Sequence, residues 1–148
     1  MNREILFRAK SKNSGRWVYG DLITQKYKSR QGVHIYEKNE SFGYQFVRID
    51  KKTISQFTGL KDAYGNNIYE GDIVKDEDEG ETLFVVKYTD YNVSSCGCCT
   101  PHFIGIGFVG ESQIMYCGDF KRCELNEYCK VVGNIYDNPE LLGERVHE

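Results

Sequence analysis

The stretch GLKDAYGNNIYEGDIVK, residues 59–75, alternates turn-forming residues with short apolar pieces. KDAYGNN (61–67) places Asp, Gly and Asn where a turn needs side-chain hydrogen bonds and positive φ angles. IY (68–69) then begins a short extended piece, EGD (70–72) makes a second tight turn, and IVK (73–75) starts another strand. The spacing therefore predicts closely spaced turns that tie one short strand to the next.

This segment is predicted to build structure and not to bind phosphate. It lacks the Gly-Lys-Ser/Thr ending of a phosphate loop, no helical pattern follows it, and no dinucleotide fingerprint is present. We expect it to be the chain crossing that locks a small barrel, with Tyr69, Ile73 and Val74 buried. Glu70 and Asp72 could share a proton-transfer site, but Asp72 stands where an aspartate caps a turn, and that role is favoured.

Strand patterns continue on both sides of the segment. The chain has eleven Tyr, eight Phe and only two Pro, a composition that favours strands over helices. Gly20 interrupts one strand pattern, which suggests a bulge or a close crossing, and Trp17 is expected to anchor the core. Strands are predicted at residues 3–9, 16–24, 33–37, 43–50, 82–90, 103–110, 112–117 and 130–137.

The fold class that follows is mainly β. We expect a small antiparallel β-barrel, SH3-like in part, with an N-terminal β extension. A short helical turn is predicted at the end of the chain, with Asn138 as its cap, Pro139 as its first position and Gly143 as its stop. Residues 1–148 are expected to form one domain, and the pattern allows a division into an N-terminal β subdomain (1–55) and a C-terminal barrel (56–142).

Composition and charge narrow the class of protein. Hydrophobic residues make up 40% of the chain and charged residues 28%, which is typical of a folded globular protein. The apolar runs are too short to cross a bilayer, and the N-terminus MNREILFRAK lacks an apolar signal core. We therefore expect the protein in the cytoplasm, with no membrane partner.

The charge is unevenly spread along the chain. Residues 1–60 contain twelve Lys/Arg and five Asp/Glu, a net charge of +7, whereas residues 61–148 contain seven and seventeen, a net charge of −10. The basic half could bind nucleic acid, but the basic residues are scattered, and attraction between the two halves or between two subunits is the favoured interpretation.

Aromatic and basic residues also interleave within the basic half. They could form a platform for single-stranded nucleic acid, although alternation in a half-buried strand explains the same pattern without a ligand. The residues of this pattern are Tyr27, Lys28, Arg30, His34, Tyr36 and Lys38. For His34 on its own, as for His147 near the end of the chain, a core or surface position is the favoured interpretation.

The six cysteines gather in one region of the chain. They are Cys96, Cys98, Cys99, Cys117, Cys123 and Cys129, and His102 follows the first three. Cys96, Cys98, Cys99 and His102 could supply zinc ligands, yet their C-x-C-C-x-x-H pattern lacks the paired C-x-x-C knuckles of common zinc sites. Free thiols are the favoured interpretation. The acidic run DEDEGE (76–81) is likewise expected to be a solvated hairpin tip and not a cation site.

The segments REILFRAK, GRWVYGDLI, TISQFTGLKDAYGNNIYEGDIV and VVGNIYDNPELL, in this order, resemble the YopX family of phage and prophage proteins. The resemblance runs from residue 3 to about residue 142 and is strongest in residues 56–74 and 131–142. It implies a mostly β protein for which no catalytic residue set is established, and the region from Cys96 to Cys129 looks peculiar to this chain. The motif positions look like turn and packing positions: Gly59, Asp62, Gly65, Tyr69, Gly71, Asp72, Gly133, Asn134 and Pro139.

Two functions stay open on the sequence. The first is a phage- or prophage-encoded accessory protein that acts as a non-enzymatic binding module for a protein or nucleic-acid partner. The alternative is a zinc-binding or metal-dependent module that uses the cluster from Cys96 to His102. No catalytic residue is nominated and no cofactor is expected, with zinc kept as the alternative. Formation of a homo-oligomer is left open.

Overall fold

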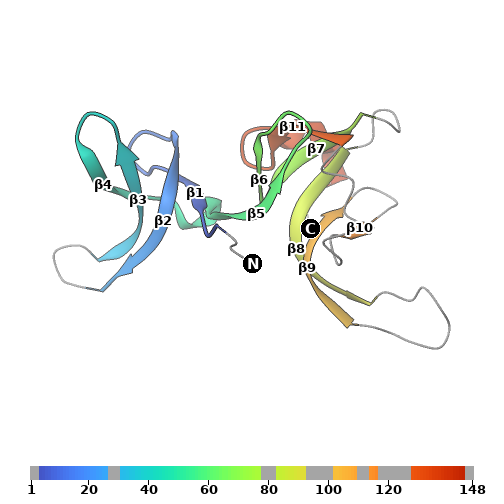
Figure 1. The fold of residues 1–148 in the computed structure, drawn as a ribbon, viewed down its shortest axis with the longest axis horizontal. Helices are drawn as coiled ribbons and strands as arrows, with labels where there is room; N and C mark the ends of the chain where they lie inside the picture. Colours follow the sequence, from blue (N-terminus) through green and yellow to red (C-terminus); the bar gives the residue numbers. More distant parts are fainter. Residues whose placement is uncertain are drawn as a thin grey trace. The chain divides into compact units, whose positions relative to one another are not determined.

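The computed structural model describes residues 4–26, 31–77, 83–92, 102–109, 114–116 and 128–145. In these ranges the chain is mainly β, with two short 3₁₀ helices, η1 (Lys51–Thr53) and η2 (Pro139–Arg145) (Figure 1). The strands are β1 (Phe7–Lys10), β2 (Trp17–Gln25), β3 (Gly32–Asn39), β4 (Gly43–Arg48), β5 (Ser55–Lys61), β6 (Asn67–Tyr69), β7 (Asp72–Asp76), β8 (Leu83–Asn92), β9 (His102–Val109), β10 (Ile114–Tyr116) and β11 (Cys129–Asn134). The predicted mainly β class is confirmed.

The strands form two sheets. The first has the order β4-β3-β2-β1-β5-β6, and the second has the order β10-β9-β8-β7-β11. The pairings β1–β2, β2–β3, β3–β4, β1–β5, β7–β8, β8–β9, β9–β10 and β7–β11 are all antiparallel. Both sheets have free ends within the described ranges, so the closed, SH3-like barrel expected for residues 56–142 is not found there.

The chain divides into two compact units, unit 1 (Met1–Gly59) and unit 2 (Leu60–Glu148). The core of unit 1 consists of Ala9, Val18, Ile35 and Ile49, and it is extended by partly buried Phe7, Leu22, Val33, Val47 and Ile54. Small and β-branched side chains from neighbouring strands interdigitate on one face of the sheet, which is the packing that such residues favour.

Two predictions about strand β2 have different outcomes. Gly20 has a φ of 154°, and a Cβ built there would overlap the backbone carbonyl of Tyr36, so the predicted close crossing is confirmed. Trp17 is only half-buried, and the prediction of a core anchor was wrong. Alternation along the strand is the reason, because Val18 occupies the core face and its neighbour must point the other way.

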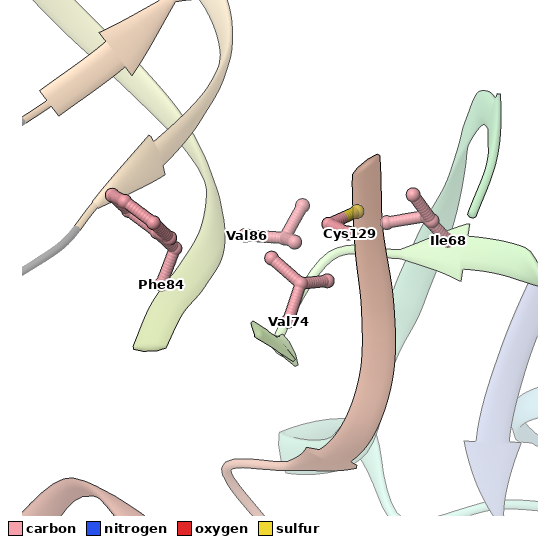
Figure 2. Packing of buried hydrophobic residues seen from close by; sticks show 5 residues of the cluster. All are labelled: Ile68, Val74, Phe84, Val86 and Cys129. Carbon is pink, nitrogen blue, oxygen red and sulfur yellow. The ribbon is translucent and has the colours of Figure 1, made fainter. Parts of the chain in front are cut away.

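Unit 2 has its own core. Ile68, Val74, Phe84, Val86 and Cys129 pack together in it, with partly buried Leu60 and Val131 against them (Figure 2). These side chains come from β6, β7, β8 and β11, so residues far apart in sequence meet in one cluster. Burial of each large apolar side chain contributes about 1.5–3 kcal/mol.

The stretch 59–75 lies at the start of this unit and follows its predicted course. It runs as the end of β5, a turn, β6, a second turn and β7. Tyr69, Ile73 and Val74 are buried, as predicted. The N–H of Gly71 in the second turn donates to the carbonyl of Val86 at 2.8 Å, so this turn is tied to β8.

The predicted C-terminal helical turn is present as η2. It begins at Pro139, and Gly143 interrupts it with a φ of 66°. Neither of the two short helices in the described ranges combines the length and apolar character that a membrane-spanning helix requires.

Candidate functional site

One face of the sheet in unit 1 points away from the core of that unit. Successive side chains of a strand point to opposite faces. In β2, Val18 and Leu22 belong to the core side, so Trp17, Tyr19 and Asp21 lie on the opposite face. Residues that pair across antiparallel strands lie on the same face, so the registers also assign each residue of β1, β3 and β4 to the core side or to the opposite face.

We call this opposite side the outer face. Its residues pair across the strands, for example Arg8 with Tyr19 and Tyr36 with Phe46. The outer face comprises Arg8, Lys10, Trp17, Tyr19, Asp21, Ile23, Gln25, His34, Tyr36, Lys38, Tyr44, Phe46 and Arg48.

Aromatic rings form a continuous stack on the outer face. The rings of Tyr36 and Tyr44 lie 4.9 Å apart with an interplanar angle of 15°, and those of Tyr36 and Phe46 lie 4.8 Å apart at 40°. His34 meets Phe46 edge to face, with ring centroids 6.4 Å apart. Tyr44 is 60% exposed and Phe46 is 40% exposed, so flat apolar rings remain open to solvent.

Cations also lie on the outer face, some beside Trp17 and others beside the stack. The Arg8 guanidinium lies 4.7 Å from the centroid of Trp17, and the Lys10 ammonium lies 5.6 Å from it, both within cation–π range. Lys38 and Arg48 are exposed beside the stack. Asp21 is an acidic member of the outer face, yet unit 1 as a whole carries twelve Lys/Arg and five Asp/Glu.

The acidic side chain of Glu37 lies on the opposite face and is neutralised there. Arg16 donates to it through both terminal nitrogens, at 2.9 and 2.7 Å, and Gln45 donates a third hydrogen bond at 3.1 Å. The hydrogen bond from Arg16 is the main reason that the pKa of Glu37 lies below its ordinary value. This carboxylate therefore does not oppose an anion that approaches the outer face.

The outer face combines two kinds of recognition. Exposed rings can stack on a flat aromatic ligand, and neighbouring ammonium and guanidinium groups can pair with its anionic groups.

Half of the aromatic and basic residues singled out from the sequence lie on the outer face. His34, Tyr36 and Lys38 are there, whereas Tyr27, Lys28 and Arg30 lie outside the described residues. The sequence reasoning missed Tyr44, Phe46 and the cations above Trp17. Alternation along residues 43–48 was the available signal, but the pairing register between β3 and β4 was needed to place these rings on the same side.

The motif residue Asp62 is the centre of a buried hydrogen-bond network in unit 2. Its carboxylate accepts from the N–H of Tyr64 at 3.0 Å, from the N–H and side-chain amide of Asn66 at 2.8 and 3.0 Å, and from the N–H of Val131 at 3.0 Å. Burial acts to raise the pKa of Asp62, but these hydrogen bonds outweigh it, and the pKa is lowered. Asp62 thus holds its own turn and connects it to β11.

The remaining acidic motif residue also holds a turn. Asp72 is almost fully buried, and its carboxylate accepts from the N–H of Tyr69 at 2.7 Å. Glu70 is half-buried nearby. The geometry supports the interpretation of Asp72 as a turn residue, which stays a prediction.

The second strong motif, residues 131–142, forms a turn after β11. The side chain of Asn134 accepts from the N–H groups of Tyr136 and Asp137, each at 3.0 Å. A Cβ at Gly133 would lie 2.5 Å from Oδ1 of Asn138, so the two backbone segments approach closely there. The other motif positions lie at turns or element ends: Gly59 and Gly65 with positive φ, Gly71 with positive φ, buried Tyr69, and Pro139 at the start of η2.

The cysteine cluster falls largely outside the described residues. Cys96, Cys98 and Cys99 are not described, and His102 is described only as the first residue of β9. Among the residues that the structure does describe, no group of three or more His, Cys, Asp or Glu side chains is placed to hold a metal. Cys129 is a free thiol inside the core of unit 2, and burial raises its pKa to about 12.

Comparisons with known proteins agree with the fold. The family model described as YopX protein matches residues 6–143. Among solved structures, protein EF1440 from Enterococcus faecalis is similar, with a TM-score of 0.52 and 20% sequence identity over 95% of this chain and 99% of that chain. At this identity the likeness shows the fold alone. The search of curated proteins gave no match.

Proposed function

Because the chain belongs to the YopX family, for which the resemblance implies no catalytic residue set, we propose that it is a non-enzymatic module that binds single-stranded nucleic acid on the outer face of unit 1. The observation that carries the proposal is the exposed stack of Tyr44, Tyr36 and Phe46, with the exposed cations Lys38 and Arg48 on the same two strands. It acts, in this proposal, as a phage- or prophage-encoded accessory protein in the cytoplasm of a host bacterium.

The stack suits unpaired bases better than a duplex. Bases of a single strand expose their faces, and stacking on an aromatic side chain is worth about 1–3 kcal/mol per base, whereas duplex bases already stack on each other. The 60% exposed ring of Tyr44 is the natural first contact. Lys38 is the cross-strand neighbour of Tyr44, and Arg48 lies further along β4 opposite His34, so the two cations supply charges that follow a phosphate backbone.

The test is fluorescence anisotropy with labelled single-stranded DNA and RNA of about 12 nucleotides, titrated from about 50 to 200 mM salt. Tyr44→Ala should weaken binding about tenfold, because one stacking contact is lost. Tyr88→Ala is the matched control, since Tyr88 is 61% exposed but lies on β8 in unit 2. Lys38→Gln should lower the slope of log affinity against log salt by about 1, and Lys87→Gln in unit 2 should leave it unchanged.

Absence of binding to every oligonucleotide at low salt would refute the proposal. An equal loss of affinity in Tyr44→Ala and Tyr88→Ala would also refute it, because the affinity would then not depend on the outer face. In the first case the aromatic stack would be better assigned to a protein partner.

A further inference from the structure

Among the described residues of unit 1, the buried polar atoms without a hydrogen-bond partner include Nδ1 of His34 and Oε1 of Gln25. Gln25 pairs with Gly32 across the β2–β3 hairpin, and Ile23 pairs with His34. Alternation then places Gln25, Gly32 and His34 together on the outer face, with Gln25 and His34 as diagonal neighbours. Buried polar atoms are nearly always paired in native proteins, so two orphans at one place indicate a missing partner.

Gly32 leaves a space beside these two side chains. A Cβ built at Gly32 would find Cε1 of His34 at 3.7 Å, an ordinary contact distance, as its nearest neighbour. A side chain would therefore fit there sterically, but the glycine leaves that volume free. The imidazole of His34, whose Nδ1 is unpaired, borders this space, and Gln25, whose Oε1 is unpaired, is the cross-strand partner of Gly32.

The space adjoins the aromatic stack. His34 is 92% buried and meets Phe46 edge to face at 6.4 Å, and its cross-strand partner on β4 is Arg48. Phe46 and Arg48 are themselves exposed, and exposed side chains change rotamer within nanoseconds. Phe46 and Arg48 can therefore rotate away from His34 without movement of the backbone.

We propose that His34 and Gln25 read the hydrogen-bonding edge of one unpaired nucleobase next to the stack of Tyr36, Tyr44 and Phe46. This inference rests on the proposed function and adds base selectivity to it. Oε1 of Gln25 only accepts, so it takes an N–H of the base, and Nδ1 of His34 meets the neighbouring polar atom of the same edge. In a duplex that edge is already paired, so only single-stranded nucleic acid fits.

A site of this kind discriminates among bases. A base whose edge matches both atoms satisfies them, whereas a mismatched base leaves a buried polar atom unpaired, and such a site rejects poor matches strongly. Stacking alone is tolerant of sequence, because every base has a flat face. The aromatic stack therefore supplies affinity, and His34 and Gln25 supply preference.

The experiment compares oligo-dA, oligo-dC and oligo-dT of about 12 nucleotides in the same anisotropy assay. The native chain should prefer one of them by about tenfold. His34→Phe and Gln25→Met replace the polar atoms with apolar groups of similar size, and each should reduce the preference to about twofold with the salt slope unchanged. Tyr44→Ala, in contrast, should weaken the binding of all three oligonucleotides and leave the order of their affinities unchanged.

Thermal unfolding of the two variants checks that they fold, and their midpoints should equal or exceed that of the native chain, because an unpaired buried atom has been removed. Binding without any base preference, or a preference that survives both substitutions, would overturn the inference while leaving the proposed function intact. Failure of the native chain to bind any of the three oligonucleotides would instead refute the proposed function, and the inference with it.

Discussion

Replacement of Asp62 by alanine should destabilise unit 2 more than any surface substitution, because one carboxylate satisfies four donors. The N–H of Val131 comes from β11, 69 residues away, and together with the bond from the Ala63 N–H to the Cys129 carbonyl it connects the turn to the sheet. Hydrogen bonds to a charged acceptor contribute about 1.5–3 kcal/mol each when the donor cannot find water. The N–H groups of Tyr64 and Asn66 lie on an exposed turn and can be rehydrated, so we count about 0.5–1 kcal/mol for each.

The expected loss of unfolding free energy for Asp62→Ala is therefore about 2.5–5 kcal/mol. Urea unfolding followed by far-UV circular dichroism measures it, and fluorescence of Trp17, the only tryptophan, follows unit 1 separately. Asp62→Asn is the matched variant. This variant keeps one acceptor oxygen but places an amide NH2 opposite the N–H of Val131. It should lose about 2–3 kcal/mol of unfolding free energy.

The pH dependence gives the same residue a second test. The pKa of Asp62 is lowered in the folded state, so its contribution is fully present above the unfolded value of about 3.9 and is lost as the pH falls through the folded pKa. The stability gap between the native chain and Asp62→Asn should stay constant from about pH 7 to 5 and narrow below about pH 4. A loss below about 1 kcal/mol for Asp62→Ala would refute the assignment of Asp62 as the centre of this network.

Three further substitutions or reactions test other parts of the fold. Gly20→Ala should cost about 2–4 kcal/mol in urea unfolding, since its Cβ would overlap the carbonyl of Tyr36, and a neutral effect would contradict the close crossing. Cys129 should react with iodoacetamide at pH 8 at least about a hundredfold more slowly in the folded than in the unfolded chain, as measured by peptide mass spectrometry, because its pKa is about 12 when buried. Glu37→Gln should cost only about 0.2–1 kcal/mol, because its partner Arg16 is 49% exposed, and that cost should shrink at high salt and as the pH falls through the lowered pKa of Glu37.

The parts of the fold that local chemistry decides could be predicted from the sequence. In residues 59–75 the turns follow from Asp, Gly and Asn at fixed offsets, and these preferences act within a few residues. Pro139 likewise marks the start of η2 because its φ is already suited to a first helical position. The closure of a barrel depends instead on pairing between strands far apart in sequence, and no local pattern specifies that pairing.

The outer face shows the same limit at the level of single residues. The sequence indicated His34, Tyr36 and Lys38 as one alternating set, but it could not say which residues of the next strand stand beside them. A shift of the register by one residue would have sent Tyr44 and Phe46 to the core side. Trp17 was misplaced for a related reason, because its size suggested burial while alternation with Val18 required the opposite face.

Alternation also explains why we interpret the aromatic stack as a binding surface and not as part of the core. The core of unit 1 is filled from the other side of the sheet by Ala9, Val18, Ile35 and Ile49, so it does not need the rings of the outer face. Cross-strand aromatic pairs stabilise a sheet, but that gain requires contact between rings and not exposure of their outer surfaces. Exposed apolar surface of this kind is a common mark of a binding site. The stack beside Lys38 and Arg48, in a unit that carries the positive charge of the chain, therefore fits a flat anionic ligand better than it fits a purely structural role.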